Sequence, residues 1–154
     1  MRSFFFTLLF VCSLFSCKSP RESGGYNLGF EDVYKDSAIG WKGHTLNDST
    51  IYTAKLDSQI FRSGAYSASI AFEGGKPQFS TWARFITKKY AGDSITFSGF
   101  IKTENVTDGY AGLWMRIDPH IAFDNMHQRG AKGTTDWTEY RITLPLDPEK
   151  TDKI

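Results

Sequence analysis

The sequence contains little cysteine, little histidine and almost no net charge. Its 154 residues include two Cys and three His, and the formal net charge is +1. A nearly neutral chain argues against nucleic-acid binding by a basic surface, because that mode needs an excess of Lys and Arg on one face. Three His leave few candidates for His-dependent catalysis. The length suits a single domain.

The common catalytic motifs are also missing. The sequence holds neither the GxSxG elbow of serine hydrolases nor the GxxxxGK loop that binds phosphates. The acidic residues show no pattern that identifies a catalytic carboxylate pair. Asp118, His120, Asp124 and His127 lie within ten residues, but their spacing is not diagnostic of a metal site, and a solvated hairpin between two strands is favoured. This segment is therefore not predicted to be catalytic.

The first residues are typical of an export signal. Arg2 is followed by an uncharged, strongly apolar stretch at residues 3–14, which is too short for a membrane-spanning helix of about 20 residues but suits a secretory signal. The stretch ends in LFSC at 14–17, which resembles a bacterial lipobox. We expect residues 1–16 to be a helical lipoprotein signal peptide and Cys17 to carry the lipid. The alternative is an ordinary signal peptide cut near Ser16.

Removal of this leader leaves no free thiol in the mature body. Cys12 lies inside the apolar stretch and Cys17 would be lipidated, so neither a disulfide nor a cysteine nucleophile is predicted. Lys18, rather than Asp, follows Cys17, and this is typical of lipoproteins sent on to the outer membrane. Residues 17–25 are polar and contain Pro and Gly, so we expect a flexible tether there. The predicted location is outside the cytoplasm, on the outer membrane, facing the periplasm or the surface.

The body from residue 26 onward shows the alternation of β-strands. Apolar and polar residues alternate in short runs separated by Gly, Asp, Asn and Ser, without a sustained helical stripe. Glycines at 64, 74–75, 92, 109 and 133 fall where turns are needed. An antiparallel β-sandwich gives each strand an apolar face to bury. The sequence therefore predicts an all-β domain over 26–154, with strands around residues 52–56, 68–72, 82–86, 95–102, 113–118 and 139–144.

Tryptophan offers the main candidate for ligand binding. Four Trp lie in or beside the predicted strands, and Trp114 and Arg116 alternate with the apolar Leu113, Met115 and Ile117. If Trp114 and Arg116 point away from the core, they form with Asp118 a surface that can stack on a sugar ring and bond its hydroxyl groups. The alternative is that each Trp fills the core.

Two sets of motifs resemble known domains. NLGFED at 27–32, with Trp41 some ten residues later, resembles the opening of galactose-binding-like jelly-roll domains, which include many carbohydrate-binding modules. ENVTDGYAGLWMRID, IAFDNM, RGAKGTTDW and TEYRITL resemble the N-terminal accessory domain of exported Bacteroidetes hydrolases, namely tail-specific serine peptidases and erythromycin-esterase-like proteins. The resemblance covers nearly all of the body.

This resemblance implies a non-catalytic accessory module that binds carbohydrate and supports an attached hydrolase. In such jelly rolls an acidic residue after the first Gly-Phe often holds a structural Ca²⁺ with an Asp of the last strand, and Glu31 matches the first position. The resemblance places the closing strand and the catalytic domain beyond Ile154, so no catalytic residue is carried over. The expected partners are a membrane, a glycan and that downstream domain. The alternative is that the chain is the N-terminal part of the peptidase or esterase itself.

Overall fold

A computed structural model of the chain describes residues 25–45, 52–76 and 78–154. The predicted signal peptide, Cys17 and the tether as far as residue 24 lie outside these residues. Within them the chain forms strands and turns but no helix, and every strand pairing is antiparallel. The predicted all-β, antiparallel fold with the character of a β-sandwich is therefore confirmed. In this part of the chain no helix has the length and apolar character to cross a membrane.

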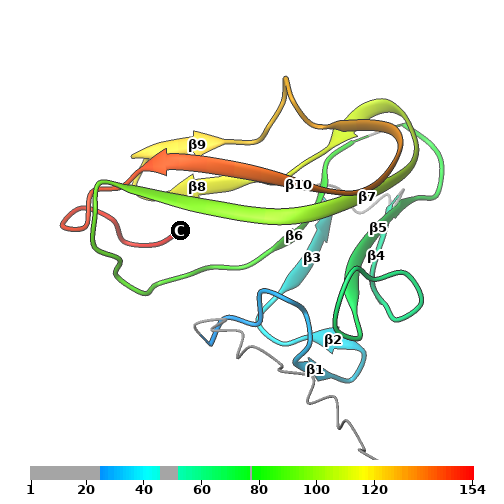
Figure 1. Cartoon of the computed structure of the whole chain (residues 1–154), viewed down its shortest axis with the longest axis horizontal. Helices are drawn as coiled ribbons and strands as arrows, with labels where there is room; N and C mark the ends of the chain where they lie inside the picture. The colour runs from blue at the N-terminus through cyan, green and yellow to red at the C-terminus, as the bar shows by residue number, and fades with distance from the viewer. Residues whose placement is uncertain (1–24, 46–51, 77) are drawn as a thin grey trace, which may run out of the picture.

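The strands form five antiparallel pairs (Figure 1). β7 pairs with β10, and the hairpin of β8 and β9 lies between them in the sequence; β1 pairs with β2, β3 with β6, and β4 with β5. The strands are β1 (Val33–Tyr34), β2 (Ser37–Ala38), β3 (Lys42–Thr45), β4 (Tyr52–Asp57), β5 (Ser67–Phe72), β6 (Ser80–Ala83), β7 (Ser94–Ala111), β8 (Met115–Ile117), β9 (Ala122–Asp124) and β10 (Ala131–Pro145).

β7 and β10 form the longest ladder of the fold, with 18 and 15 residues. Phe97 lies opposite Ile142, and Thr96 lies opposite Thr143. Opposing residues of an antiparallel pair share a face, so the first pair faces the core while the two threonine hydroxyls meet on the outer face, 2.8 Å apart. The period-two alternation predicted this division of the two faces.

The core lies between the inner face of the β7–β10 ladder and the β8–β9 hairpin. Gly99 on β7 allows a close approach there, because a Cβ at this position would lie 3.2 Å from the Cδ2 atom of Leu113. The buried members of the core are Met115, Ile117, Met126, Ile142, Leu144 and Leu146. The β8–β9 hairpin is thus held against the ladder by one side only.

The strand predicted at residues 82–86 is wrong in extent. β6 ends at Ala83, and Ile86 instead exchanges two backbone hydrogen bonds with Ile154, with N–O distances of 2.7 and 2.9 Å. Ladder bonds need a partner strand, and the partner of this segment comes from residues nearly 70 positions away. Alternation within a segment contains no information about that partner.

Two of the predicted turns are also wrong. Gly109 and Gly133 lie inside β7 and β10, with φ values of 79° and 68°. Register shifts flank Gly133 on both sides, which is how a bulge with a left-handed residue continues a strand instead of ending it. For this reason β7 and β10 are much longer than the strands expected around residues 95–102 and 139–144.

The β4–β5 pair has the predicted alternation but not the predicted burial. Tyr52 lies opposite Phe72 and Ala54 opposite Ile70, so their side chains share one face, and the rings of Tyr52 and Phe72 lie 5.4 Å apart. Ile70 and Phe72 are nevertheless exposed. Among the described residues, this apolar face is only partly covered.

Candidate functional site

The β8–β9 hairpin carries the three side chains that the sequence singled out for ligand binding. β8 and β9 pair antiparallel, so the hairpin predicted for this segment is confirmed. Met115 and Ile117 point into the core and are 4% and 0% exposed. Because neighbouring residues of a strand face opposite sides, Arg116 points to solvent. Trp114, just before the strand, is 40% exposed.

Trp114 and Phe123 form an aromatic pair on the outer side of this hairpin. Their ring centroids lie 5.3 Å apart at an interplanar angle of 69°, which is the edge-to-face arrangement that aromatic pairs favour. Phe123 is 52% exposed and lies directly opposite Arg116 in the strand register. The guanidinium carbon of Arg116 lies 5.6 Å from the Trp114 ring centroid, within range of a cation–π contact. The pair therefore presents ring surface beside a cation.

Asp118 completes this surface and is held by two cations. Arg116 donates a hydrogen bond from a terminal nitrogen to Oδ2 at 3.0 Å, and its Nε lies 2.9 Å from Oδ1. The ammonium of Lys153 lies 3.8 Å from Oδ2. The Asp118 side chain is only 16% exposed. The structure thus brings the three predicted residues together, and we name Trp114, Arg116, Asp118 and Phe123 the Trp114 face.

Chemically, the Trp114 face combines ring surface with oriented donors and an acceptor. Exposed aromatic rings stack on the apolar face of a flat ligand, and a few fixed polar groups orient it. Arg116 can only donate hydrogen bonds, while Asp118 accepts them. A sugar ring offers an apolar face and a rim of hydroxyl groups, so this arrangement fits its chemistry.

Glu31 lies elsewhere and has a contact of its own. Its Oε2 atom accepts a hydrogen bond from the backbone N–H of Ala65 at 2.9 Å. A Cβ on Gly64, where φ is +78°, would collide with this carboxylate, so the glycine makes room for it. The contact ties the loop between β4 and β5 to the N-terminal segment. Among the described residues, no group of three or more His, Cys, Asp or Glu is placed to hold a metal ion.

The NLGFED motif forms a compact hydrogen-bonded corner. The buried side chain of Asn27 donates to the carbonyl oxygens of Asp32 and Ile39 and accepts from the N–H of Asp32. The indole N–H of Trp41 donates to the Asn27 carbonyl at 2.8 Å. The Phe30 ring packs 4.7 Å from that of Trp41. The motif and Trp41, which the sequence linked only by resemblance, are therefore one structural unit.

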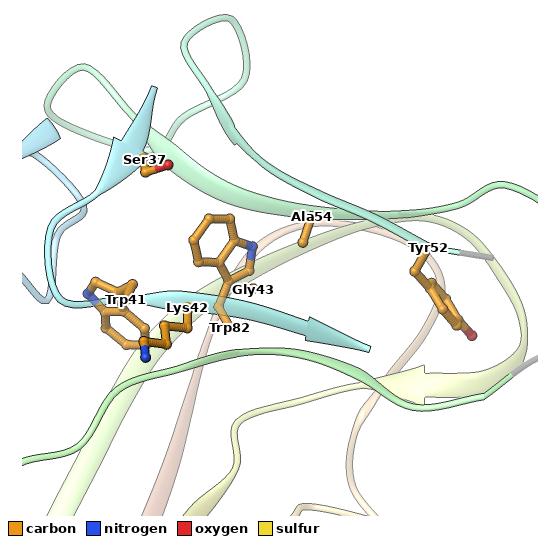
Figure 2. A pocket seen from close by; sticks show the side chains of 7 residues that line it. All are labelled: Ser37, Trp41, Lys42, Gly43, Tyr52, Ala54 and Trp82. Atoms are coloured by element: carbon orange, nitrogen blue, oxygen red, sulfur yellow. The ribbon is translucent and has the colours of Figure 1, made fainter. Parts of the chain in front are cut away.

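A pocket of about 470 Å³ lies beside this corner (Figure 2) and was not predicted from the sequence. Its indole rings are anchored by their N–H groups, since Trp82 donates to the Ser69 carbonyl at 3.0 Å. Gly43 lets the strands approach, because a Cβ there would lie 2.9 Å from that of Ala54. A glycine inside a strand was the available signal. The pocket is lined by Ser37, Trp41, Lys42, Gly43, Tyr52, Ala54 and Trp82.

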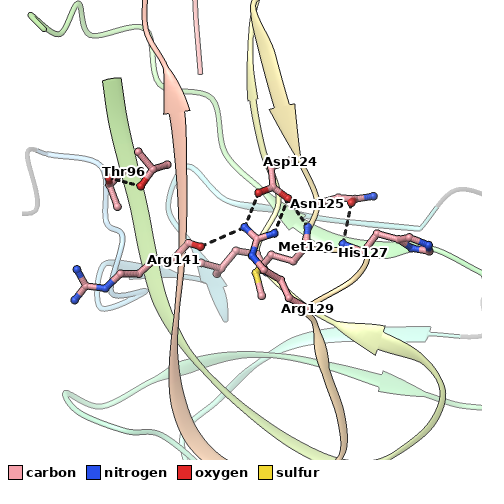
Figure 3. A network of polar contacts seen from close by, with 9 residues as sticks. Thr96, Asp124, Asn125, Met126, His127, Arg129 and Arg141 are labelled. Atoms are coloured by element: carbon pink, nitrogen blue, oxygen red, sulfur yellow. Dashed lines mark hydrogen bonds and ion pairs between the residues drawn. The ribbon is translucent and has the colours of Figure 1, made fainter. Parts of the chain in front are cut away.

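Asp124 serves local structure beside the hairpin (Figure 3). Arg129 donates to both carboxylate oxygens of Asp124, at 3.0 Å for the Nη1–Oδ1 pair. These bonds, together with one from the Met126 N–H, hold the pKa of Asp124 below its usual value. The Asn125 side chain accepts from the His127 N–H. The network fixes the segment that leads from β9 to β10.

Comparison with known proteins gives one partial match. The Bacillus subtilis (strain 168) protein YbfP, named an uncharacterized HTH-type transcriptional regulator, is 39% identical over 82 residues. The matching stretch is 50% of this chain and 27% of YbfP, so it spans about a quarter of that relative. No family model and no solved structure matches.

Proposed function

We propose that this chain is a non-catalytic β-sandwich module that binds carbohydrate on the Trp114 face. The supporting observation is the exposure of Trp114 beside Phe123, while the strand neighbours Met115 and Ile117 are buried. Burying aromatic rings in the core is the common outcome in a small sandwich, and here these two rings are left in solvent next to the Arg116–Asp118 pair. Stacking of a sugar ring gives such exposure a function.

The finer fold and the setting of the module belong to the same proposal. We infer a galactose-binding-like jelly roll, of the type that precedes exported Bacteroidetes hydrolases, anchored to the outer membrane by a lipid on Cys17. The hydrogen-bonded corner around Asn27 and Trp41 supports the resemblance of the NLGFED segment. A tail-specific serine peptidase or erythromycin-esterase-like domain is the proposed catalytic partner, and the reading frame beyond Ile154 tests this.

A structural Ca²⁺ near Glu31 stays a prediction of the resemblance. A carboxylate is a suitable ligand for this hard cation, and Glu31 already accepts the N–H of Ala65. If calcium binds there, millimolar CaCl₂ raises the midpoint of thermal unfolding, EDTA lowers it, and Glu31→Gln removes the difference. An equal midpoint in CaCl₂ and EDTA contradicts the prediction.

DNA binding enters only through the name of the Bacillus subtilis relative. Helix-turn-helix proteins read DNA with a recognition helix in the major groove. The described residues of this chain contain no helix, and the formal net charge of the whole sequence is +1. We therefore do not propose DNA recognition for these residues.

Affinity electrophoresis tests the proposal. The full chain is run in native gels that contain soluble neutral or acidic polysaccharides, beside Trp114→Ala and the control Tyr34→Ala, which removes a different exposed ring. We expect retardation by at least one polysaccharide and a weakening of about tenfold in Trp114→Ala alone, the size of a stacking contact. No retardation by any polysaccharide, or equal retardation of Trp114→Ala and the parent, contradicts carbohydrate binding on this face.

A further inference from the structure

The Trp114 face continues beyond the residues that the sequence singled out. The ammonium of Lys153 lies 3.8 Å from Asp118 Oδ2 and 5.2 Å from the ring centroid of Phe85. Phe85 is 64% exposed, more than either ring of the Trp114 face. Contacts therefore run from one aromatic end to the other through Phe123, Trp114, Arg116, Asp118, Lys153 and Phe85.

Backbone hydrogen bonds hold the three segments that build this row. The Asp118 N–H donates to the carbonyl oxygen of Lys153 at 2.9 Å, and the Asp152 N–H donates to the carbonyl oxygen of Asp118 at 2.9 Å. Ile154 exchanges two further bonds with Ile86. The segment 152–154 thus lies between β8 and the segment that carries Phe85. These backbone hydrogen bonds fix the relative positions of the residues in the row before a ligand binds.

The charge of the row is positive. Arg116 and Lys153 face one carboxylate, that of Asp118. Asp118 accepts a hydrogen bond from one terminal nitrogen of Arg116 and lies 2.9 Å from its Nε, which leaves the other terminal nitrogen for a ligand. We therefore expect this row to bind an anionic ligand more tightly than a neutral ligand of the same shape.

We propose that the row from Phe123 to Phe85 binds an acidic oligosaccharide, a chain of several sugar rings that carry carboxylates; this inference rests on the proposed carbohydrate binding. One sugar ring stacks on one aromatic surface, so two aromatic ends separated by three charged side chains fit several linked rings. The cations between the ends meet the carboxylates of the middle rings, and Asp118 orients the cations and accepts from hydroxyl groups.

Isothermal titration with two matched sugars tests this proposal. One probe is a hexamer of galacturonic acid, and the other is the same hexamer with its carboxylates methyl-esterified, which keeps the rings and removes the charge. The variants are Lys153→Gln, Phe85→Ala and the control Lys150→Gln, whose ammonium pairs with Asp147 and not with a residue of the row. We expect the acidic hexamer to bind about tenfold more tightly than its ester, and Lys153→Gln to remove most of that preference.

The remaining outcomes separate the two proposals. Salt should weaken binding of the acidic hexamer and leave the ester unchanged, a measurement that needs no variant. Phe85→Ala should weaken binding of the galacturonic acid hexamer and leave binding of a galacturonic acid dimer unchanged. Equal, Trp114-dependent binding of both hexamers with no salt effect overturns the acidic ligand and keeps carbohydrate binding. Absence of binding to every sugar overturns both proposals. Loss of the preference in Lys150→Gln as well as in Lys153→Gln contradicts a localised site.

Discussion

Arg116 donates a hydrogen bond from a terminal nitrogen to Asp118 Oδ2 at 3.0 Å, and its Nε lies 2.9 Å from Oδ1 in the same ion pair. The two residues are two positions apart at the end of β8, so strand geometry places both side chains on the solvent side. A hydrogen bond and a second close ionic contact to the same carboxylate restrict the position of the guanidinium. The donors of Arg116 are therefore oriented before any ligand arrives.

This pair should stabilise the fold more than a similar one nearby. Arg141 contacts Glu139 with the same spacing, at 2.8 Å, but both partners are more exposed. We expect Arg116→Gln to lower the free energy of unfolding by about 1 kcal/mol and Arg141→Gln by about 0–0.5 kcal/mol. Urea unfolding at low salt measures both values. An equal loss in the two variants contradicts a special role for the Arg116–Asp118 pair.

Substitutions on the two faces of the β8–β9 hairpin should have different effects, one on stability and the other on ligand binding. Ile117→Ala leaves a cavity in the core and should lower the free energy of unfolding by about 2–5 kcal/mol. Trp114→Ala removes an exposed ring and should change that energy by less than about 1 kcal/mol, while it weakens retardation by polysaccharide about tenfold. Paired urea unfolding and affinity electrophoresis check both statements. A large loss of stability in Trp114→Ala means that this ring supports the fold.

Asn27 should be essential to the N-terminal corner. Its side chain makes three hydrogen bonds to backbone groups and is buried. Removing it leaves the part-buried Asp32 N–H without its partner, at about 1–3 kcal/mol, while the carbonyl oxygens of Asp32 and Ile39 keep bonds from the Ile39 N–H and from Arg84. We therefore expect Asn27→Ala to lower the thermal midpoint. Asn125→Ala is the control, because Asn125 makes one local bond to the His127 N–H. Similar midpoints for the two variants contradict this role of Asn27.

Asp124 should make the fold depend on pH under acidic conditions. Hydrogen bonds from Arg129 hold the pKa of this carboxyl below its usual value. The ionised carboxylate therefore adds to the free energy of unfolding above about pH 4, and this contribution is lost as the pH falls through the lowered pKa of the folded state. Asp124→Asn should be less stable than the parent at pH 7, and the difference should shrink between pH 4 and pH 2. Other carboxylates titrate in both proteins and cancel in the comparison.

Lipidation is tested directly at Cys17. In a bacterial host that processes lipoproteins, metabolic labelling with palmitate should mark the parent chain and leave Cys17→Ala unlabelled. Cys12→Ala is the matched control and should be labelled like the parent, because Cys12 lies within the predicted leader. A labelled Cys17→Ala, or an unlabelled parent, contradicts the lipobox interpretation.

The local parts of the fold and of the Trp114 face were predictable. Alternation placed Met115 and Ile117 on the core side and Arg116 on the solvent side, since a strand can divide its side chains in no other way. The pocket beside Trp41 and Trp82 was not predictable. It depends on β3, β4 and β6 meeting around Gly43. The alternation of residues within one segment does not show which distant segment it pairs with.

By itself, the sequence determined the class of secondary structure, the inward face of strands such as β8 and β10, and the grouping of Trp114, Arg116 and Asp118 on one edge. These features follow from a repeat of two residues along one strand. Only the tertiary structure decided which strands pair, how far β7 and β10 extend through Gly109 and Gly133, and that Lys153 and Phe85 join the same surface. Such contacts join residues far apart in the chain, and backbone hydrogen bonds between those segments select them.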